Sequence, residues 1–311
     1  MGVRKIVNTN QKPTKKYKLK KEFIATLCVV TIIGGSISVN AIKNKIETSK
    51  EEQAKIELQF KKEKAEKERI AKLKTQFPSV GEKGLDNAYN SSIIWDRLQK
   101  FDYSPLDGQK VVFLTYDDGP SITNTPVILD TLRKHNVNAT FFVTGKTIER
   151  GGENANKILQ DAYNDGNSIA NHSYSHDYKT LYPGRALNLD MFLNDFNKTE
   201  NLLKNALGED FSTTVWRCPG GYMSWKEMAP LKDYASSNGI GVIDWNALNK
   251  DAEGKRKNAD ELYQEAVNTS KGKDMIVLLM HDTYGKEETA KYTDKIIQYY
   301  KDNGYVFKTL A

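Results

Sequence analysis

The chain has 311 residues, and hydrophobic residues make up 39% of it, which suits a globular protein with a sizeable core. Its formal net charge of +6 arises at the N-terminus, because residues 1–21 carry eight basic and no acidic side chains, whereas residues 105–311 carry 24 basic and 28 acidic ones. A mildly acidic C-terminal part argues against a nucleic-acid partner.

The N-terminal 42 residues have the pattern of a membrane signal anchor. A basic tail (residues 1–22), expected in the cytoplasm, precedes an uncharged run at residues 23–42. This run has the ~20-residue length that crosses a bilayer, so we expect a single-pass membrane protein with the rest of the chain outside the cytoplasm. A cleaved signal peptide, for which VNA at 39–41 loosely fits the cleavage pattern, and a buried helix are the alternatives. Cys28 lies in this run, so a disulfide with Cys218 is not expected.

Residues 43–104 are interpreted as a charged helical stalk and a linker. The stretch 43–77 is dense in Lys and Glu and has neither Gly nor Pro, which predicts a solvated helix. Its apolar residues are too sparse for a sustained heptad seam, so a spacer is favoured over a coiled-coil dimer, and the oligomeric state stays open. Pro78, Gly81 and Gly84 are expected to end the helix.

From residue 105 onward, short apolar runs alternate with helical patterns, which predicts an α/β fold with a parallel sheet. Seven or eight such repeats in ~200 residues favour a distorted (β/α)7–8 barrel over an open sheet. The expected strands span residues 111–116, 139–145, 213–217, 240–245, 275–281 and 304–310, with a further short strand at 169–170. The expected helices span residues 124–135, 154–165, 186–206, 226–237, 258–270 and 286–301.

Reactive side chains stand at the ends of several expected strands. They are Asp117, Asp118, His172, Arg217 and His281. In α/β barrels the carboxyl ends of the strands form the active-site face, so these residues are expected to meet there.

Two histidines four residues apart have a spacing at which both side chains can hold a metal, although such pairs are more often surface or capping residues. His172 and His176 resemble the metalloprotease pattern H-E-x-x-H, but Ser173 stands where the catalytic Glu belongs, so a base must come from elsewhere. His135, at the end of a helical run, is interpreted as a structural residue.

Four motifs occur in one order: TYDDGP at 115–120, HSYSH at 172–176, RCPGG at 217–221 and LMH at 279–281. Together they resemble the polysaccharide deacetylase family, carbohydrate esterase family 4, and in particular its peptidoglycan N-acetylglucosamine deacetylases, over about residues 110–310. The resemblance implies one divalent cation, Zn²⁺ or another such as Co²⁺, held by Asp118, His172 and His176. Three N/O ligands with an open position are a catalytic arrangement. The resemblance also implies Asp117 as the base, Arg217 as the residue that keeps it ionised, and His281 as the acid.

The resemblance further implies substrate contacts, with two departures from the family pattern. The expected substrate-binding residues are Pro219, Gly220, Tyr222, Trp245 and Leu279, with Leu279 against the acetyl methyl group and a backbone N–H of residues 219–222 on the oxyanion. The family's W-x-x-D-x-x-D-W has Leu248 and Ala252 at two key places, so either Asp251 or Asp244 is expected to tune His281. The aromatic residue usual after Pro219 is missing, and Tyr222 or Trp225 is expected to stack on the sugar instead.

The function implied is metal-dependent N-deacetylation of N-acetylglucosamine in cell-wall peptidoglycan, with release of acetate. Alternatives within the family are deacetylation of muramic acid units, chitin oligomers or poly-N-acetylglucosamine, and xylan O-acetyl esterase activity. A catalytically inactive, glycan-binding cell-wall module is the alternative outside enzymology. The complete set of base, acid and metal ligands favours an enzyme.

Overall fold

The structure is a computed structural model that describes residues 39–311. The basic tail and most of the expected anchor at 23–42 lie outside the described residues. Within residues 39–311, no helix is both long and apolar enough to cross a membrane. Residues up to Ala65 form one unit, and Glu66–Ala311 form a second, compact one.

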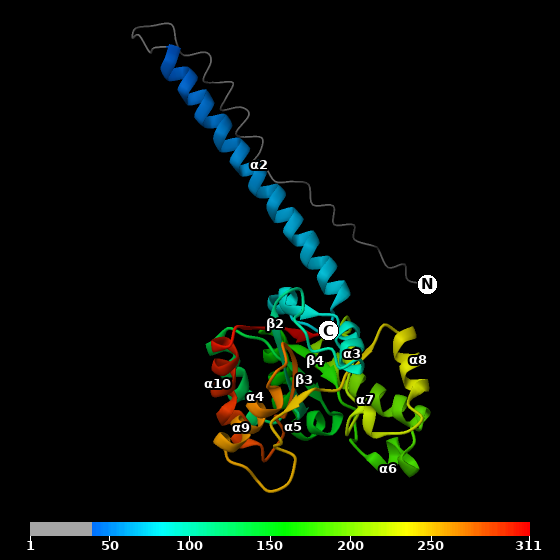
Figure 1. Cartoon of the computed structure of the whole chain (residues 1–311). Helices are drawn as coiled ribbons and strands as arrows, with labels where there is room; N and C mark the ends of the chain where they lie inside the picture. The colour runs from blue at the N-terminus through cyan, green and yellow to red at the C-terminus, as the bar shows by residue number, and fades with distance from the viewer. Residues whose placement is uncertain (1–38) are drawn as a thin grey trace, which may run out of the picture. The chain divides into compact units, whose positions relative to one another are not determined.

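Helix α2 (Val39–Gln76) is the charged helix expected from the sequence (Figure 1). Side chains from Lys45 to Arg69 are exposed, which agrees with a solvated helix. The helix ends two residues before Pro78, because the residue before a proline is disfavoured in helical conformation.

Residues 77–104 pack into the compact unit and are not an extended linker. Near the start, Phe77, Val80 and Leu85 are buried together with the C-terminal Ala311. Helix α3 (Ser91–Gln99) then buries three apolar side chains in the core: Ile94, Trp95 and Leu98. The side chain of Asn90 caps this helix by accepting a hydrogen bond from Ser92 N at 2.9 Å. The compact unit therefore begins at Glu66, whereas the catalytic domain was expected to begin at residue 105. Helix α3 was not predicted because a helix of nine residues has too few apolar positions to show a clear helical periodicity.

The main sheet is parallel, has eight strands, and follows the order β6-β5-β4-β3-β2-β8-β7, with β9 also paired to β2. Its strands are β2 (Lys110–Gly119), β3 (Thr140–Val143), β4 (Ser168–Asn171), β5 (Val215–Trp216), β6 (Gly241–Val242), β7 (Ala247–Leu248), β8 (Met275–His281) and β9 (Tyr305–Phe307). A separate two-stranded sheet pairs β1 (Ala88–Tyr89) with β10 (Thr309–Leu310).

The expected barrel is a curled half-barrel. Among residues 39–311, no strand ladder joins β6 to β7, so the sheet stays open there, and α3 lies beside β6. Strands expected at 213–217 and 240–245 shrink to two residues each, because both segments leave the ladder to position polar loops at the end of the sheet. The strand expected at 304–310 divides into β9 and β10.

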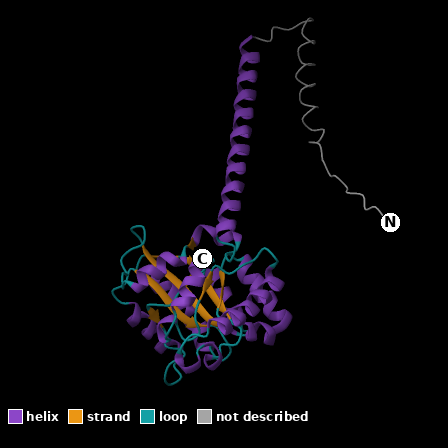
Figure 2. Cartoon of the chain, turned by 90° about the vertical axis from the view of Figure 1, so that its right-hand side faces the viewer, coloured by secondary structure: helices purple, strands orange, loops and turns teal. Residues whose placement is uncertain are grey.

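Helices surround the sheet on its outer side (Figures 1 and 2). The longer ones are α4 (Asn124–His135), α5 (Gly145–Asn164), α7 (Leu189–Leu207), α8 (Ala229–Ser237), α9 (Ala259–Ser270) and α10 (Glu287–Asp302). The shorter ones are α6 (Tyr178–Leu181), η1 (Glu82–Asn87), η2 (Pro183–Arg185) and η3 (Tyr222–Ser224). Helix α5 starts nine residues before its expected start at 154, because it continues across a break at Gly152, where φ is +55°.

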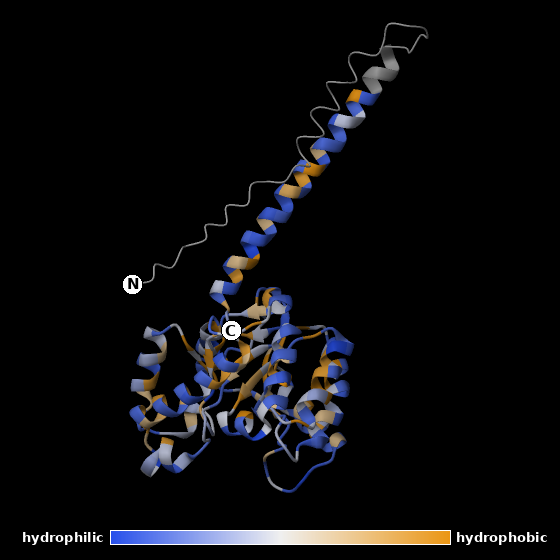
Figure 3. Ribbon diagram, turned by 180° about the vertical axis from the view of Figure 1, so that it is seen from behind, coloured by the Kyte–Doolittle hydropathy of each residue, from blue (hydrophilic) through white to orange (hydrophobic). Residues whose placement is uncertain are grey.

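The alternation of side chains along β2 divides the core into two layers. Val112, Leu114 and Tyr116 pack under the outer helices, whereas Val111 and Phe113 point into the half-barrel, where α3 covers them. Burial of each such side chain contributes roughly 1.5–3 kcal/mol. The central strands are correspondingly among the most hydrophobic parts of the ribbon (Figure 3).

Candidate active site

Strands β2 and β8 bring a carboxylate and an imidazole to the same end of the sheet. Asp117 and His281 are register partners in the parallel ladder. Both follow the inward-facing alternation of their strands, so their side chains face the inside of the half-barrel beyond its apolar core. Leu279, two residues before His281, shares this face and is 7% exposed.

An irregularity in β2 turns the next carboxylate toward the same site. Neighbours on a regular strand point to opposite faces, so Asp118 would face the outer helices. The register between β2 and β3 shifts between Asp117 and Gly119, and Asp118 adopts a left-handed conformation with φ of +67°. Such a conformation costs on the order of 1–3 kcal/mol and is typical of functional sites. The bulge lets adjacent residues contribute two carboxylates to one site.

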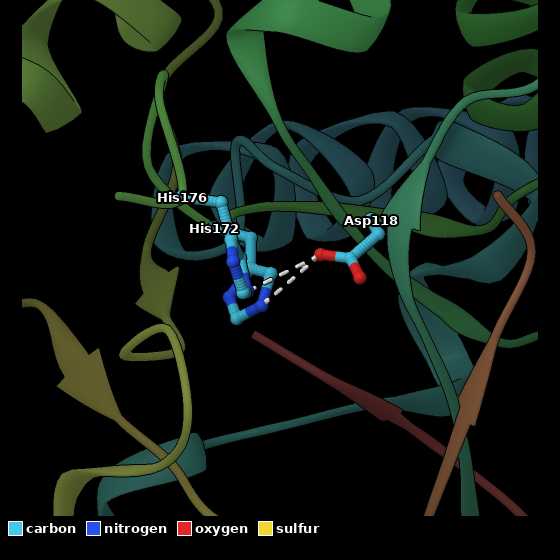
Figure 4. Close-up of side chains that lie close together, drawn as sticks. All are labelled: Asp118, His172 and His176. Atoms are coloured by element: carbon cyan, nitrogen blue, oxygen red, sulfur yellow. Dashed lines mark ion pairs between the residues drawn. The ribbon is translucent and has the colours of Figure 1, made fainter. Parts of the chain in front are cut away.

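Three side chains form a cluster with the composition of a metal site, which we call the metal cluster: Asp118, His172 and His176. Each offers one ligand atom, and these atoms lie within 4.8 Å of one another. Asp118 Oδ1 lies 3.6 Å from His172 Nε2 and 3.4 Å from His176 Nε2, with both imidazoles facing the carboxylate (Figure 4). In the part of the chain that the structure describes, this oxygen is buried and has no hydrogen-bond partner. A buried, unsatisfied carboxylate oxygen between two imidazole nitrogens fits a divalent cation well.

The protein fixes the form of His172 that a metal requires. Its Nδ1 donates to the backbone carbonyl of Arg217 at 2.8 Å, which leaves Nε2 directed at Asp118. Burial lowers the pKa of His172 to about 3, so its imidazole stays neutral, as a ligand must be.

The two histidines lie on a tight loop and not on a helix. Ser173 and His176 have φ of +73° and +50°. The carboxylate of the buried Asp195 accepts hydrogen bonds from Tyr174 N at 2.7 Å and Ser175 N at 3.0 Å, and so holds the loop in place. Asp195 was not predicted from the sequence, where the one indication of its role is that a carboxylate occurs among the apolar residues of the buried face of α7.

Asp117 is paired with Arg217 in a buried ion pair. Arg217 Nη1 lies 2.7 Å from Asp117 Oδ1, and also donates to Thr115 Oγ1 at 2.8 Å. The other oxygen of Asp117 lies 3.6 Å from His172 Nε2, next to the metal cluster. Burial raises the pKa of Asp117 above its ordinary value, against the opposing positive charges of Arg217 and His281. A carboxylate with a raised pKa binds a proton more readily, as a general base must.

Asp251, from the loop after β7, is the carboxylate that pairs with His281. Its Oδ1 lies 2.7 Å from His281 Nδ1, and its Oδ2 accepts hydrogen bonds from the backbone N–H of His281 and from Thr289 Oγ1. Burial lowers the pKa of His281, but the hydrogen bond and charge of Asp251 outweigh it and raise the pKa to about 9. His281 is thus protonated at neutral pH and able to donate a proton.

Asp244, the other candidate partner of His281, has a different role. Its two oxygens accept hydrogen bonds from Tyr222 N at 2.7 Å and Met223 N at 3.1 Å, so it anchors the loop after Arg217. Gly221 N donates to Cys218 O. Pro219 has no N–H, so Gly220 N is the remaining donor of residues 219–222 that could bind an oxyanion.

The aromatic residues that were expected to contact the sugar, Tyr222, Trp225 and Trp245, also pack against other parts of the protein. The ring of Tyr222 packs edge-on against Trp95 at 5.3 Å and its hydroxyl donates to Met228 O, so it belongs to the core. Trp225 stacks on Tyr182, and its Nε1 donates to Pro219 O at 2.8 Å. Trp245 is half-buried against Gly221. Tyr222 therefore packs against the core, and Trp225 is half-buried with one ring face covered by Tyr182.

Two further residues named from the sequence, His135 and Cys218, are not part of the cluster. His135 Nε2 lies 2.9 Å from the Asp294 carboxylate on the outer helices, remote from the site. Cys218 is buried with a free thiol, and Cys28 lies outside the described residues.

A second buried aspartate next to the site was missed. Asp282 comes directly after His281, the last residue of β8. It packs against Gly119 and accepts a hydrogen bond from Thr125 Oγ1 at 2.5 Å. Burial raises its pKa to about 7.

Comparisons with known proteins agree with this arrangement. The family model described as polysaccharide deacetylase matches residues 106–239. The chain is 31% identical over 220 residues to a peptidoglycan-N-acetylglucosamine deacetylase of Bacillus cereus, a match that covers 70% of the chain and 72% of that protein. It is 28% identical over 237 residues to the peptidoglycan-N-acetylmuramic acid deacetylase PdaC of Bacillus subtilis, covering 74% of the chain but 46% of PdaC. The chain therefore spans less than half the length of PdaC.

The fold is similar to that of a solved structure. A CE4 esterase from Streptococcus mutans matches with a TM-score of 0.67 and 34% identity, over 74% of this chain and 94% of the other.

Proposed function

The chain belongs to the polysaccharide deacetylase family, and on this premise we propose that it hydrolyses the acetamide of N-acetylglucosamine residues in cell-wall peptidoglycan, leaving glucosamine and releasing acetate. The similarity to a Bacillus cereus protein named for this reaction supports the choice of sugar. The pairing of a buried base with a protonated acid across one metal-type cluster supports hydrolysis over mere glycan binding.

The proposal assigns a divalent cation, Zn²⁺ with Co²⁺ as a substitute, to Asp118, His172 and His176. When bound, such a cation supplies a water of lowered pKa and polarises the acetyl carbonyl. Asp118 Oδ1, which is buried and has no hydrogen-bond partner within residues 39–311, is the atom that most directly supports this assignment.

Asp117 is proposed to accept the proton of the attacking water. Its free oxygen is directed toward the metal cluster while Arg217 holds the other, so the carboxylate keeps its orientation when it gains a proton. The Gly220 amide is proposed to donate to the oxygen that becomes negative as the carbonyl carbon turns tetrahedral.

His281 is proposed to protonate the leaving amine. As the carbon–nitrogen bond breaks, the amine needs a proton, and a histidine whose charged form Asp251 stabilises is able to supply it. His281 Nε2 lies 3.9 Å from Asp118 Oδ2, so the acid stands beside the metal cluster. Leu279, on the same face of β8, is proposed to contact the acetyl methyl group.

We also propose that residues 23–42 anchor the protein in the cell membrane with the catalytic unit outside the cytoplasm. The uncharged run and its lysine-rich flank support this location, which matches that of a cell-wall substrate.

The observation that carries the proposed function is the convergence of Asp117, Asp118, His172, His176 and His281 at one end of the sheet. The test is to incubate the zinc-loaded protein with purified peptidoglycan, to measure acetate, and to identify by mass spectrometry the sugar that has lost 42 Da, about the mass difference of an acetyl group. Loss from N-acetylglucosamine supports the proposal. Loss only from muramic acid contradicts the choice of sugar, and release by the Asp117→Asn variant contradicts the mechanism.

A further inference from the structure

Tyr178 is an exposed aromatic residue beside the metal cluster. It is the first residue of α6, two positions after His176, and its side chain is 44% exposed. Its ring centroid lies 5.3 Å from that of His176 and 5.1 Å from that of Trp225. A large apolar ring that stays exposed at the edge of a polar site is a candidate for ligand contact.

The position of Tyr178 is fixed from both sides. On the backbone side, the carboxylate of Asp177 accepts hydrogen bonds from Lys179 N at 3.0 Å and Thr180 Oγ1 at 2.8 Å, which caps α6. On the side-chain side, Trp225 stacks on Tyr182 with centroids 4.1 Å apart and an interplanar angle of 8°. Trp225 thus supports the Tyr178 ring, and Tyr178 is the most exposed of the three residues, since Tyr182 is buried and Trp225 is half-buried.

The absence of a side chain at Gly220 lets the rings of Tyr178 and Trp225 lie close to the backbone of the loop after Arg217. A Cβ atom at residue 220 would lie 3.1 Å from Trp225 Cζ2 and 3.3 Å from Tyr178 Oη, and the φ of +77° there disfavours any other residue. The two rings therefore fill the space that a side chain at position 220 would enter. Tyr178 consequently borders both the metal ligand His176 and the loop whose amide is proposed to bind the oxyanion.

We infer that Tyr178 forms a sugar-binding surface, against which the pyranose ring of the substrate packs while its acetamide reaches the metal cluster. The apolar C–H face of a pyranose matches an exposed aromatic ring, and rigid aromatic residues provide contact area at little entropic cost. In this chain the aromatic surface comes from α6, after the second histidine, instead of from the position after Pro219. The inference rests on the proposed function for the kind of sugar that binds.

The experiment measures binding separately from turnover. Asp117→Asn protein, loaded with zinc, is titrated by calorimetry with the N-acetylglucosamine tetramer, alone and combined with Tyr178→Ala or Tyr178→Phe. We expect Tyr178→Ala to raise Kd about tenfold and Tyr178→Phe, which keeps the ring, to change it less than about twofold. Ile93→Ala is the matched control, because Ile93 is 48% exposed on α3 and the inference gives it no contact with sugar.

Zinc content by elemental analysis and the thermal midpoint are measured for each variant. An unchanged Kd in Tyr178→Ala overturns the inference, as does an equal loss in Tyr178→Phe, a loss of zinc, or absence of tetramer binding by the Asp117→Asn protein. Failure of the proposed function gives a different result. If the wild-type chain binds the tetramer without releasing acetate, yet Tyr178→Ala weakens binding, the sugar-binding surface stands and the proposed reaction does not.

Discussion

Asp251 holds His281 by two hydrogen bonds at once, one to the imidazole Nδ1 at 2.7 Å and one to the backbone N–H at 3.0 Å. The two residues are 30 positions apart: Asp251 lies in the loop after β7, and His281 is the last residue of β8. Because Nδ1 is engaged by a carboxylate, Nε2 is the nitrogen that faces the metal cluster, and it is the nitrogen from which the proposed mechanism draws a proton.

Replacing Asp251 by Asn is expected to move the basic limb of the pH profile to lower pH. His281 must be protonated to act as an acid, so activity is lost as the pH rises through its pKa, which Asp251 raises to about 9. An amide supplies no charge, and we expect the limb of kcat/KM to shift by at least about one pH unit. The smaller change Thr289→Val, which removes one hydrogen bond to Asp251, should shift it less. A basic limb that stays in place in Asp251→Asn would show that His281 is not the acid.

Replacing Asp117 by Asn is expected to abolish catalysis while leaving the metal bound. The amide keeps the shape of the side chain but cannot accept the water's proton, and loss of a general base costs about 10²–10⁴-fold in kcat. Acetate release and zinc content are measured on the same sample. Normal turnover with full zinc occupancy would refute the assignment of the base.

Replacing His172 by Ala is expected to remove the metal. One of three ligands is lost, and we expect zinc affinity to fall by more than about 100-fold, since loss of a mere outer contact costs 10–100-fold. His135→Ala is the control, because this histidine pairs with Asp294 on the surface. Equal zinc affinities for the two variants, measured by competition with a chelator, would contradict the site.

Replacing Arg217 by Met is expected to destabilise the fold through Asp117. The arginine side chain is fully buried and that of Asp117 is 3% exposed, so the variant leaves an unpaired buried carboxylate, at a cost of about 3–5 kcal/mol. The loss of Arg217 raises the pKa of Asp117 further, so the penalty applies above that pKa and diminishes at lower pH, where the carboxyl is neutral. Denaturant unfolding at pH 5 and pH 8 measures the difference. The double variant with Asp117→Asn should recover part of the stability, and strict additivity of the two changes would argue against the pair.

Truncation is expected to place the start of the folded unit near residue 66. A chain of residues 66–311 retains α3 and the segment that packs against Ala311, whereas residues 105–311 lack both. Loss of Ile94, Trp95 and Leu98 removes roughly 1.5–3 kcal/mol of burial per side chain and uncovers the inside of the half-barrel. Cooperative thermal unfolding of residues 105–311 at the same midpoint as 66–311 would contradict this boundary.

The sequence predicted those parts of the fold that depend on long periodic or apolar runs. Strands β2 and β8 and helices α4, α9 and α10 are such runs, and their bounds agree with the structure to within three residues. The ordered motifs singled out Asp118, His172 and His176, which the structure brings together, with Asp117 and His281 beside them. What the sequence did not predict depends on tertiary contacts: the left-handed Asp118, the choice of Asp251 over Asp244, and the burial of α3. Tyr178 was missed because its exposure beside His176 follows from how α6 and Trp225 pack, for which there is no local pattern.

Arg217 contacts both the cluster of candidate metal ligands and the candidate base. The carbonyl of Arg217 accepts a hydrogen bond from His172, the proposed metal ligand, and its guanidinium donates to Asp117, the proposed base. A shift of Arg217 would therefore change both the orientation of the His172 imidazole and the ion pair of Asp117. If the proposed roles hold, a substitution that shifts the backbone at Arg217 changes zinc affinity and the pKa of Asp117 together, so the two properties have to be measured in the same variant.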